Sequence, residues 1–183
     1  MALFWLMLAS MLAMVALFPL SWAWIKRYQH GHYHYAGEQT TLSASPRRFY
    51  ALALNVSGVS LLAGLIFSVA MGVGVALMAI DSAAARVAAV ALVIAPAYLA
   101  ILSTLSSYTG ARLQNLVWNS TRSQHVEFRS TLLFNALLRL TLKNVLLTVL
   151  TLGLYRPFAV IATTRLKLQA MTVTLEGEVD RWV

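Results

Sequence analysis

Long uncharged stretches alternate with short basic segments along this chain. Residues 1–25, 49–80 and 87–111 contain no Asp, Glu, Lys or Arg, over 25, 32 and 25 residues respectively. About 20 apolar residues in a helix cross a bilayer core of about 30 Å. Each stretch is therefore long enough to span, and the sequence predicts transmembrane helices at about 1–25, 49–80 and 87–111. The expected fold class is an all-α integral membrane protein, with residues 1–183 forming one polytopic domain.

The region 131–168 does not fit a simple span. It is apolar in patches but carries Arg139, Lys143 and Arg156, and Gly153 interrupts its pattern. Basic residues flank both ends, which places both ends on one side of the membrane, and a helix of this length is too short to cross twice. We expect a broken or re-entrant helical hairpin, buried in protein or lining water. The alternative is an amphipathic helix on the membrane surface whose cations snorkel to the headgroups.

The placement of charge gives a topology. The net charge is +8, which alone would allow nucleic-acid binding. Most of the cations, however, lie after the first predicted span, beginning with Lys26 and Arg27, and after the third. Between the second and third spans the only charged residues are Asp81 and Arg86. The positive-inside rule then places the basic loops in the cytoplasm and the N-terminus outside. We expect the lipid bilayer, including anionic lipid, as the partner, and no nucleic acid.

Short strand-like segments follow the helices. A proline precedes an arginine by eight residues at Pro19 and Arg27, and again at Pro157 and Arg165. Alternating segments then follow, and they predict short cytoplasmic β-hairpins at the helix ends. These segments are residues 31–35, 39–43, 116–121, 125–130 and 171–175. The alternative is that the aromatic and basic residues only mark the membrane interface.

One run of residues resembles a known family. Residues 144–159 read Asn-Val-Leu-Leu-Thr-Val-Leu-Thr-Leu-Gly-Leu-Tyr-Arg-Pro-Phe-Ala, similar to the signature of the YjgN family of bacterial inner-membrane proteins, a domain of unknown function. Phe158 stands where that family usually has Trp. Segments 118–121, 126–132 and 178–182 are also similar to the family.

The resemblance implies a location in the bacterial inner (cytoplasmic) membrane. It implies no reaction, substrate or catalytic residue. Family members are usually longer and carry an earlier copy of the signature. We therefore expect this chain to correspond to a C-terminal portion of such a protein.

A histidine cluster is the sharpest candidate for a metal site. His30, His32 and His34 would share one face if they lay on a strand. Three imidazoles could then bind zinc, nickel or copper, with Glu38 or His125 completing the set. The alternative is an interfacial loop rich in His and Tyr. The chain has no cysteine, which excludes disulfides and cysteine-based metal centres.

Polar residues within apolar surroundings form a second candidate site. Arg139, Lys143, Asn144 and Arg156 lie in the interrupted region. If they are buried, they would line a path for an anion or a lipid headgroup. For Arg139 and Lys143 the alternative is snorkelling to the membrane surface.

Function remains broad at this point. No nucleophile lies in a pattern with a histidine and a carboxylate, so we expect no enzyme and no cofactor. The leading hypothesis is an inner-membrane protein that acts as a transport or lipid-interacting component. The alternatives are a metal-dependent membrane protein and a scaffold. The scaffold would assemble, as a homo-oligomer, through small-residue faces such as Gly58, Gly64, Gly72 and Gly74.

Overall fold

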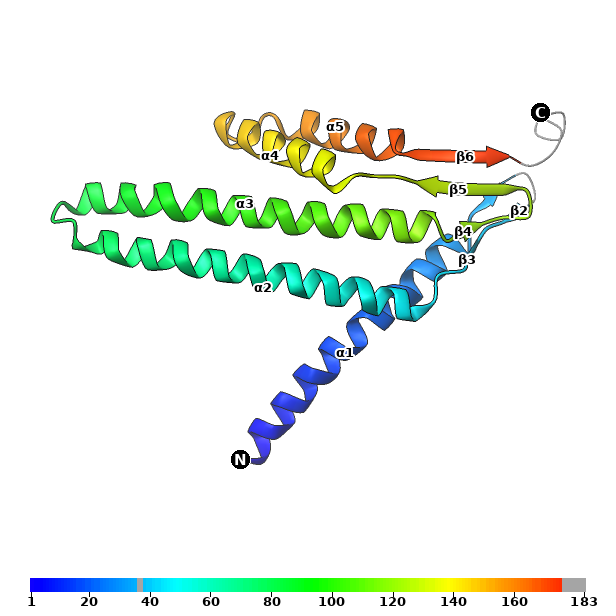
Figure 1. Ribbon diagram of the computed structural model, residues 1–183, viewed down its shortest axis with the longest axis horizontal. Coiled ribbons are helices and arrows are strands. Elements are labelled where there is room, and N and C mark those ends of the chain that lie inside the picture. Colours follow the sequence, from blue (N-terminus) through cyan, green and yellow to red (C-terminus); the bar gives the residue numbers. More distant parts are fainter. Residues whose placement is uncertain (36–37, 176–183) are drawn as a thin grey trace. The chain divides into compact units, whose positions relative to one another are not determined.

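The computed structural model is mostly helical and describes residues 1–35 and 38–175 (Figure 1). The helices are α1 (Ala2–His30), α2 (Pro46–Ala76), the short 3-10 helix η1 (Leu77–Ala79), α3 (Ala83–Trp118), α4 (Phe134–Leu150) and α5 (Arg156–Gln169). The strands are β1 (His34–Tyr35), β2 (Glu38–Gln39), β3 (Thr41–Leu42), β4 (Thr121–Arg122), β5 (Val126–Ser130) and β6 (Met171–Leu175). The similarity noted at 178–182 lies outside the described residues.

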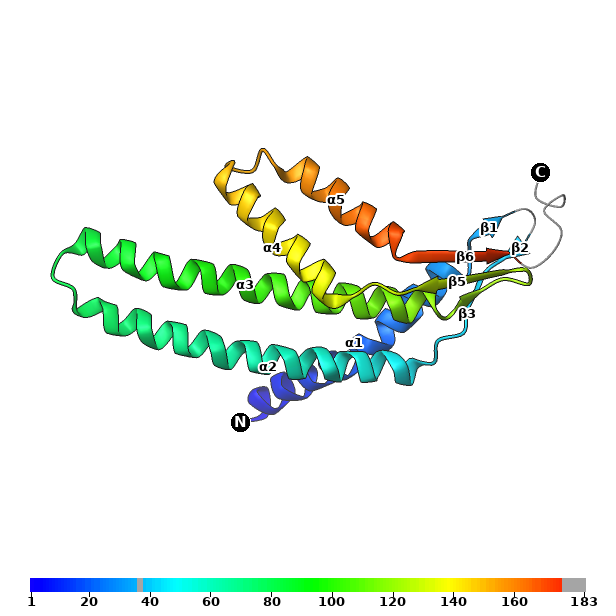
Figure 2. The ribbon, with the colours of Figure 1, turned by 45° about the horizontal axis from the view of Figure 1, so that its top comes forward.

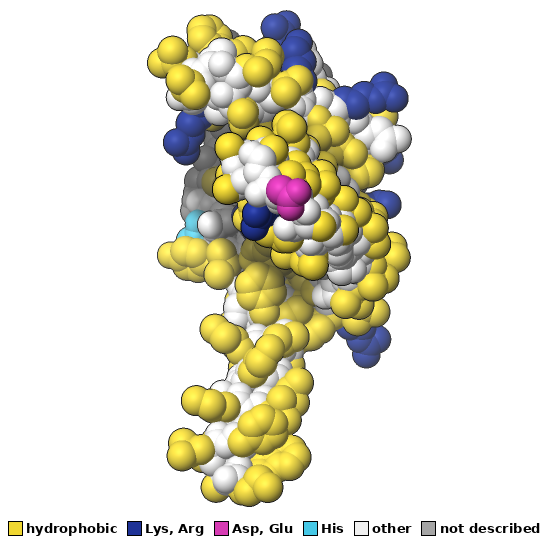
Figure 3. Space-filling model, turned by 90° about the vertical axis from the view of Figure 1, so that its left-hand side faces the viewer, with side chains coloured by type: hydrophobic (Ala, Val, Ile, Leu, Met, Phe, Trp, Pro, Cys, Tyr) yellow, Lys and Arg dark blue, Asp and Glu magenta, His cyan; other side chains and the backbone are white. Residues whose placement is uncertain are grey.

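The long helices confirm the predicted spans. Ala2–His30, Pro46–Ala79 and Ala83–Trp118 are 29, 34 and 36 residues long and apolar enough to cross a membrane. Their large apolar side chains are mostly exposed, as expected of helices whose solvent is lipid. Hydrophobic side chains also cover much of the face drawn in Figure 3. Three candidate spans are therefore present, in a chain that also carries a small antiparallel sheet.

One predicted strand is helical over its first three residues. Residues 116–121 were expected to be extended, but α3 continues to Trp118. Leu113, Leu116 and Val117 lie three and four residues apart, so a helix places them on one face. That face packs in a small core with Phe49, which is fully buried. A short alternating run does not distinguish the helical period from the strand period, and here packing against the core favours the helix.

The chain divides into two compact units. The first comprises residues 1–54, 113–131 and, in its described part, 170–175. Its four-stranded antiparallel sheet has the order β3-β4-β5-β6, and β1 pairs separately with β2. Hairpins form where expected between β1 and β2 and between β4 and β5. The segment 171–175 forms the predicted strand, but it pairs with β5 from Val126↔Leu175 to Ser130↔Met171.

An asparagine joins the end of α3 to the sheet. The side-chain amide of Asn119 donates to the carbonyl of Ser130 at 3.1 Å, and its Oδ1 accepts from the Ser130 amide at 2.6 Å. The Ser130 hydroxyl also donates to Oδ1 of Asn115 at 2.8 Å. Asn119 thus pairs with the end of β5 as a neighbouring strand would.

The second unit comprises residues 55–112 and 132–169. It contains most of α2 and α3 together with α4 and α5, which fold back on each other (Figure 2). The interruption predicted at Gly153 is present, because α4 ends at Leu150 and α5 begins at Arg156. The ring of Phe134 meets Tyr108 of α3 edge to face, with ring centroids 5.7 Å apart.

Candidate functional site

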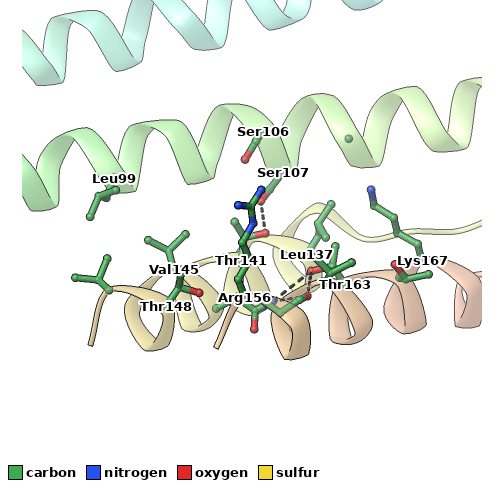
Figure 4. A pocket seen from close by; sticks show the side chains of 16 residues that line it. Leu99, Ser106, Ser107, Leu137, Thr141, Val145, Thr148, Arg156, Thr163 and Lys167 are labelled. Atoms are coloured by element: carbon green, nitrogen blue, oxygen red, sulfur yellow. Dashed lines mark hydrogen bonds between the residues drawn. The ribbon is translucent and has the colours of Figure 1, made fainter. Parts of the chain in front are cut away.

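A groove lies between α3, α4 and α5 within the second unit (Figure 4). Its volume is about 660 Å³, within the range of small-molecule sites. Apolar side chains such as Leu99, Leu137 and Val145 form much of its wall. Hydroxyl groups lie among them, from Ser106, Ser107, Thr141, Thr148, Thr163 and Thr164. The groove is therefore amphipathic, with an apolar body and a row of hydrogen-bonding groups.

Hydrogen bonds fix the walls of the groove to each other. The Ser107 hydroxyl on α3 donates to the Thr141 hydroxyl on α4 at 3.0 Å. Close packing supports this contact, because a Cβ placed on Gly110 would lie 3.5 Å from a Leu137 methyl. The polar side of α4 thus faces α3 along the groove.

Asn144 lines the groove and is only 6 % exposed. Its Nδ2 donates to the Ala159 carbonyl and to the Thr163 hydroxyl, both at 3.2 Å. The carbonyl can only accept, which fixes the orientation of the amide. The Asn144 Oδ1 is buried and has no hydrogen-bond partner among the described residues. A buried acceptor of this kind is uncommon in a native structure.

Two cations of α5 line the same groove, Arg156 and Lys167. Both side chains extend from α5 toward α3 in Figure 4. Within the described part of the chain, no hydrogen bond or ion pair of the Arg156 guanidinium is found. Helices α3, α4 and α5 contain no Asp or Glu, but seven cations: Arg86, Arg112, Arg139, Lys143, Arg156, Arg165 and Lys167. The groove therefore has a positive potential that no acid of its own helices offsets.

The predicted polar cluster separates into two groups. Asn144 and Arg156 line the groove, whereas Arg139 and Lys143 are exposed on α4 and do not line it. Their spacing of four residues places both cations on one helix face. That face is apart from the one formed by Thr141, Asn144 and Thr148.

Lys167 and the hydroxyl groups were not among the residues predicted to form the site. Helical periodicity could have pointed to them, because residues three and four apart share a helix face. Ala159, Thr163 and Lys167 follow one another at intervals of four on α5. Ser and Thr are common in membrane helices, however, and only the facing helix makes these residues a wall.

The turn between α4 and α5 is closed on itself. The amides of Thr151, Leu152, Gly153, Leu154 and Arg156 each donate to a carbonyl within residues 147–153. The Tyr155 amide donates to the Thr151 hydroxyl at 3.0 Å. The next residue, Pro157, has no amide hydrogen. Every backbone donor from 151 to 157 therefore has an internal partner.

The histidines do not share a strand. His30 is the last residue of α1, Gly31 caps that helix, and His32 lies in an exposed bend. Only His34 belongs to a strand, β1, and its side chain, like that of Glu38, lies outside the described part. The strand geometry assumed for the three imidazoles is therefore wrong at His30 and His32. The helix continues further than the uncharged stretch because Lys26 and Arg27 are good helix formers.

His30 is buried against aromatic rings. Its ring meets Trp118 and Tyr33 edge to face, with centroids 4.9 and 5.3 Å away. The Thr121 hydroxyl donates to the Val117 carbonyl at 2.9 Å, so Nδ1 of His30 donates to Thr121, 3.2 Å away. This arrangement accounts for His30 as a packed and hydrogen-bonded side chain.

His32 lies elsewhere. Its Nδ1 donates to the Tyr28 carbonyl at 2.7 Å. Among the described residues no group of three His, Cys, Asp or Glu side chains is placed to hold a metal. With the His34 side chain outside that part, the metal site stays a prediction.

Comparison with known proteins identifies the family but no close relative. No curated protein and no solved structure matches the chain. One family model, described as a bacterial protein of unknown function, matches residues 1–183. Because that match covers the whole sequence given, the chain belongs to the DUF898 family of bacterial proteins of unknown function.

Proposed function

We propose that this protein binds an anionic amphiphile, such as an anionic phospholipid, in the groove between α3, α4 and α5. It would thereby serve as a transport or lipid-interacting component of the bacterial inner membrane, in a binding role and not a catalytic one. The observation that carries the proposal is the groove itself. Its wall is largely apolar, it contains Arg156 and Lys167, and its three helices contain no acid.

The membrane setting supports this ligand class. Three candidate spans in a bacterial family indicate a multi-pass membrane protein. A free inorganic anion would gain nothing from contact with the apolar part of the wall. A neutral lipid would gain nothing from its uncompensated positive charge. An amphiphile with a negative headgroup uses both, through hydrocarbon contact and charge-assisted hydrogen bonds.

The finer family and topology assignments are part of the proposal. The similarity of residues 144–159 to the YjgN signature supports placement in that group. The same residues form the α4–α5 turn and part of the groove. The distribution of Lys and Arg supports cytoplasmic basic loops and an N-terminus outside.

Thermal stability of the detergent-purified protein tests the proposal. A ligand that binds only the folded state raises stability by about 2.7 kcal/mol at 100 times its Kd. We expect phosphatidylglycerol to raise Tm more than phosphatidylcholine does. Arg156→Gln should remove the difference between the two lipids.

Arg139→Gln is the matched control, because Arg139 has the same charge but lies outside the groove. It should retain the response to phosphatidylglycerol. Equal losses in the two variants would mean that general surface charge attracts the lipid, and the groove would be rejected as its site.

A further inference from the structure

The α4–α5 hairpin reaches only to the middle of α3. Leu99 is the central residue of the uncharged stretch 87–111, and it lines the groove beside Val145 and Val149 near the end of α4. At the other end of α4, Phe134 contacts Tyr108. In Figures 1 and 2, α4 starts beside the later half of α3 and runs toward its middle, and Figure 2 shows α4 leaving α3 at an angle. If α3 spans the membrane, the turn of the hairpin therefore lies at the depth of the bilayer midplane.

The turn is suited to that depth. Leu152 and Leu154 are 95 % and 81 % exposed, and no charged residue lies between Lys143 and Arg156. Its backbone donors are satisfied internally from Thr151 to Arg156. Hydrocarbon requires such internal satisfaction, because it cannot replace a missing hydrogen bond. A turn in water would need neither feature.

The two faces of α4 differ at the same depth. Thr141, Asn144 and Thr148 line the groove, whereas the outer face exposes leucines, with Arg139 and Lys143 among them earlier along the helix. These leucines are Leu142, Leu146 and Leu150. From Leu146 to Leu150, next to the turn, the outer face thus suits lipid tails, whereas the groove face suits water or a headgroup.

We propose that α4 and α5 form a re-entrant hairpin, and that the groove is a hydrated, anion-attracting vestibule. It runs from the membrane surface near Lys167 to the bilayer midplane near Arg156 and admits a phosphate headgroup. Lys167 follows Arg156 by 11 positions, which correspond to about 16 Å of helix, about half of the hydrocarbon core. The nature of the anion rests on the proposed function, but the vestibule does not.

Arg156 gives the vestibule its selectivity. A guanidinium at the midplane is costly unless it faces water, a polar partner or an anion. Arg156 lines the groove, so it would attract an anion to the inner end.

Thiol labelling in vesicles tests this directly, because the chain has no cysteine of its own. Thr148→Cys places a thiol in the groove, and Leu146→Cys is the matched control on the lipid-facing side of the same turn. Each is treated in phosphatidylcholine vesicles with an anionic sulfonate and a cationic trimethylammonium methanethiosulfonate, with rates normalised to a free thiol. We expect Thr148→Cys to react with the anionic reagent at least about fivefold faster than with the cationic one.

Leu146→Cys should react with neither reagent, and Arg156→Gln should abolish the preference at Thr148→Cys. Equal labelling at both positions would overturn the re-entrant hairpin in favour of a surface helix. A preference that survives Arg156→Gln would overturn the role of Arg156.

Protection of Thr148→Cys separates this inference from the proposed function. Short-chain phosphatidylglycerol should slow the labelling, and inorganic phosphate at the same concentration should not. Equal protection by phosphate would overturn the amphiphile and leave the vestibule intact. A lipid-dependent Tm without labelling of Thr148→Cys would overturn the vestibule and leave lipid binding intact.

Discussion

The side-chain amide of Asn144 on α4 donates to the carbonyl oxygen of Ala159 on α5, 3.2 Å away. The same carbonyl accepts from the Thr163 hydroxyl at 2.8 Å. The bond from Asn144 to Ala159 joins the two helices of the hairpin inside the groove. It also leaves the Asn144 Oδ1 buried without a described partner, so one side chain both holds the hairpin and carries an unsatisfied acceptor.

Asn144→Asp should destabilise the protein by about 1–3 kcal/mol near neutral pH. A carboxylate cannot donate to the Ala159 carbonyl, and it would bring a negative charge beside a buried acceptor. The loss should shrink as pH falls, because a protonated carboxyl can donate again. Thermal unfolding as a function of pH measures both effects. Asn135→Asp is the control, since Asn135 is exposed in the first turn of α4, where an acid is favourable. A similar loss of stability in that variant would contradict the role of the Asn144 amide.

Thr151→Val tests whether the turn lies in the membrane. The substitution keeps the shape and removes the acceptor of the Tyr155 amide. In hydrocarbon the orphaned amide should cost about 1–3 kcal/mol, whereas in water the cost should be near zero. Thr104→Val is the control, because its hydroxyl only donates to the Ala100 carbonyl of its own helix. Equal Tm values for the two variants in bicelles would argue for a turn exposed to water.

Gly153→Ala should lower stability through backbone strain. Gly153 has φ +95° and follows Leu152 at φ 50°, so two successive residues leave the right-handed region. A side chain at Gly153 should cost about 1–3 kcal/mol. Gly64→Ala is matched to it, since an added Cβ meets nothing within 4 Å at either position and only Gly153 has a positive φ. A comparable loss of Tm in both variants would contradict the role of strain.

Much of the helical fold could be predicted because bilayer thickness sets a length that sequence reveals directly. The three spans were found by the absence of charge, and the break at Gly153 by a glycine and a proline in an apolar run. The four-stranded sheet could not be found in this way. Strands β3 and β4 have only two residues each, and they exist through pairing between Leu42 and Thr121, 79 positions apart.

The candidate site was predictable only in part, for a similar reason. Asn144 and Arg156 stood out as polar residues in an apolar region, and both line the groove. Arg139 and Lys143 stood out equally but are exposed away from it. Charge alone does not say which helix face meets a neighbour. Only the contact with α3, where Ser107 lies 34 positions before its partner Thr141, makes one face of α4 a wall and the other a surface.

His30→Ala should cost about 1–3 kcal/mol, because it removes two aromatic contacts and the hydrogen bond to Thr121. His32→Ala, at an exposed bend, should stay within about 0.5 kcal/mol. Thermal unfolding compares the two variants. Zinc or nickel added to the same samples tests the metal prediction, since a bound metal would raise the wild-type Tm and His32→Ala would remove the rise. Similar stability of the two apo variants would contradict the packing role of His30.

Reporter fusions should place Ser123 in the cytoplasm and Ser82 outside. Ser123 lies between β4 and β5, and Ser82 lies in the turn before α3; α3 joins the two, so they must differ if it spans. The expected orientation follows from cations such as Arg112, Arg122 and Arg129 at the later end of α3, against Asp81 and one arginine at its start. An alkaline phosphatase and green fluorescent protein pair at each position gives opposite signals.

Reversed signals would invert the topology and make the proposed vestibule open outward. Like signals at both positions would mean that α3 does not cross, and the depth assigned to Arg156 would fall with it.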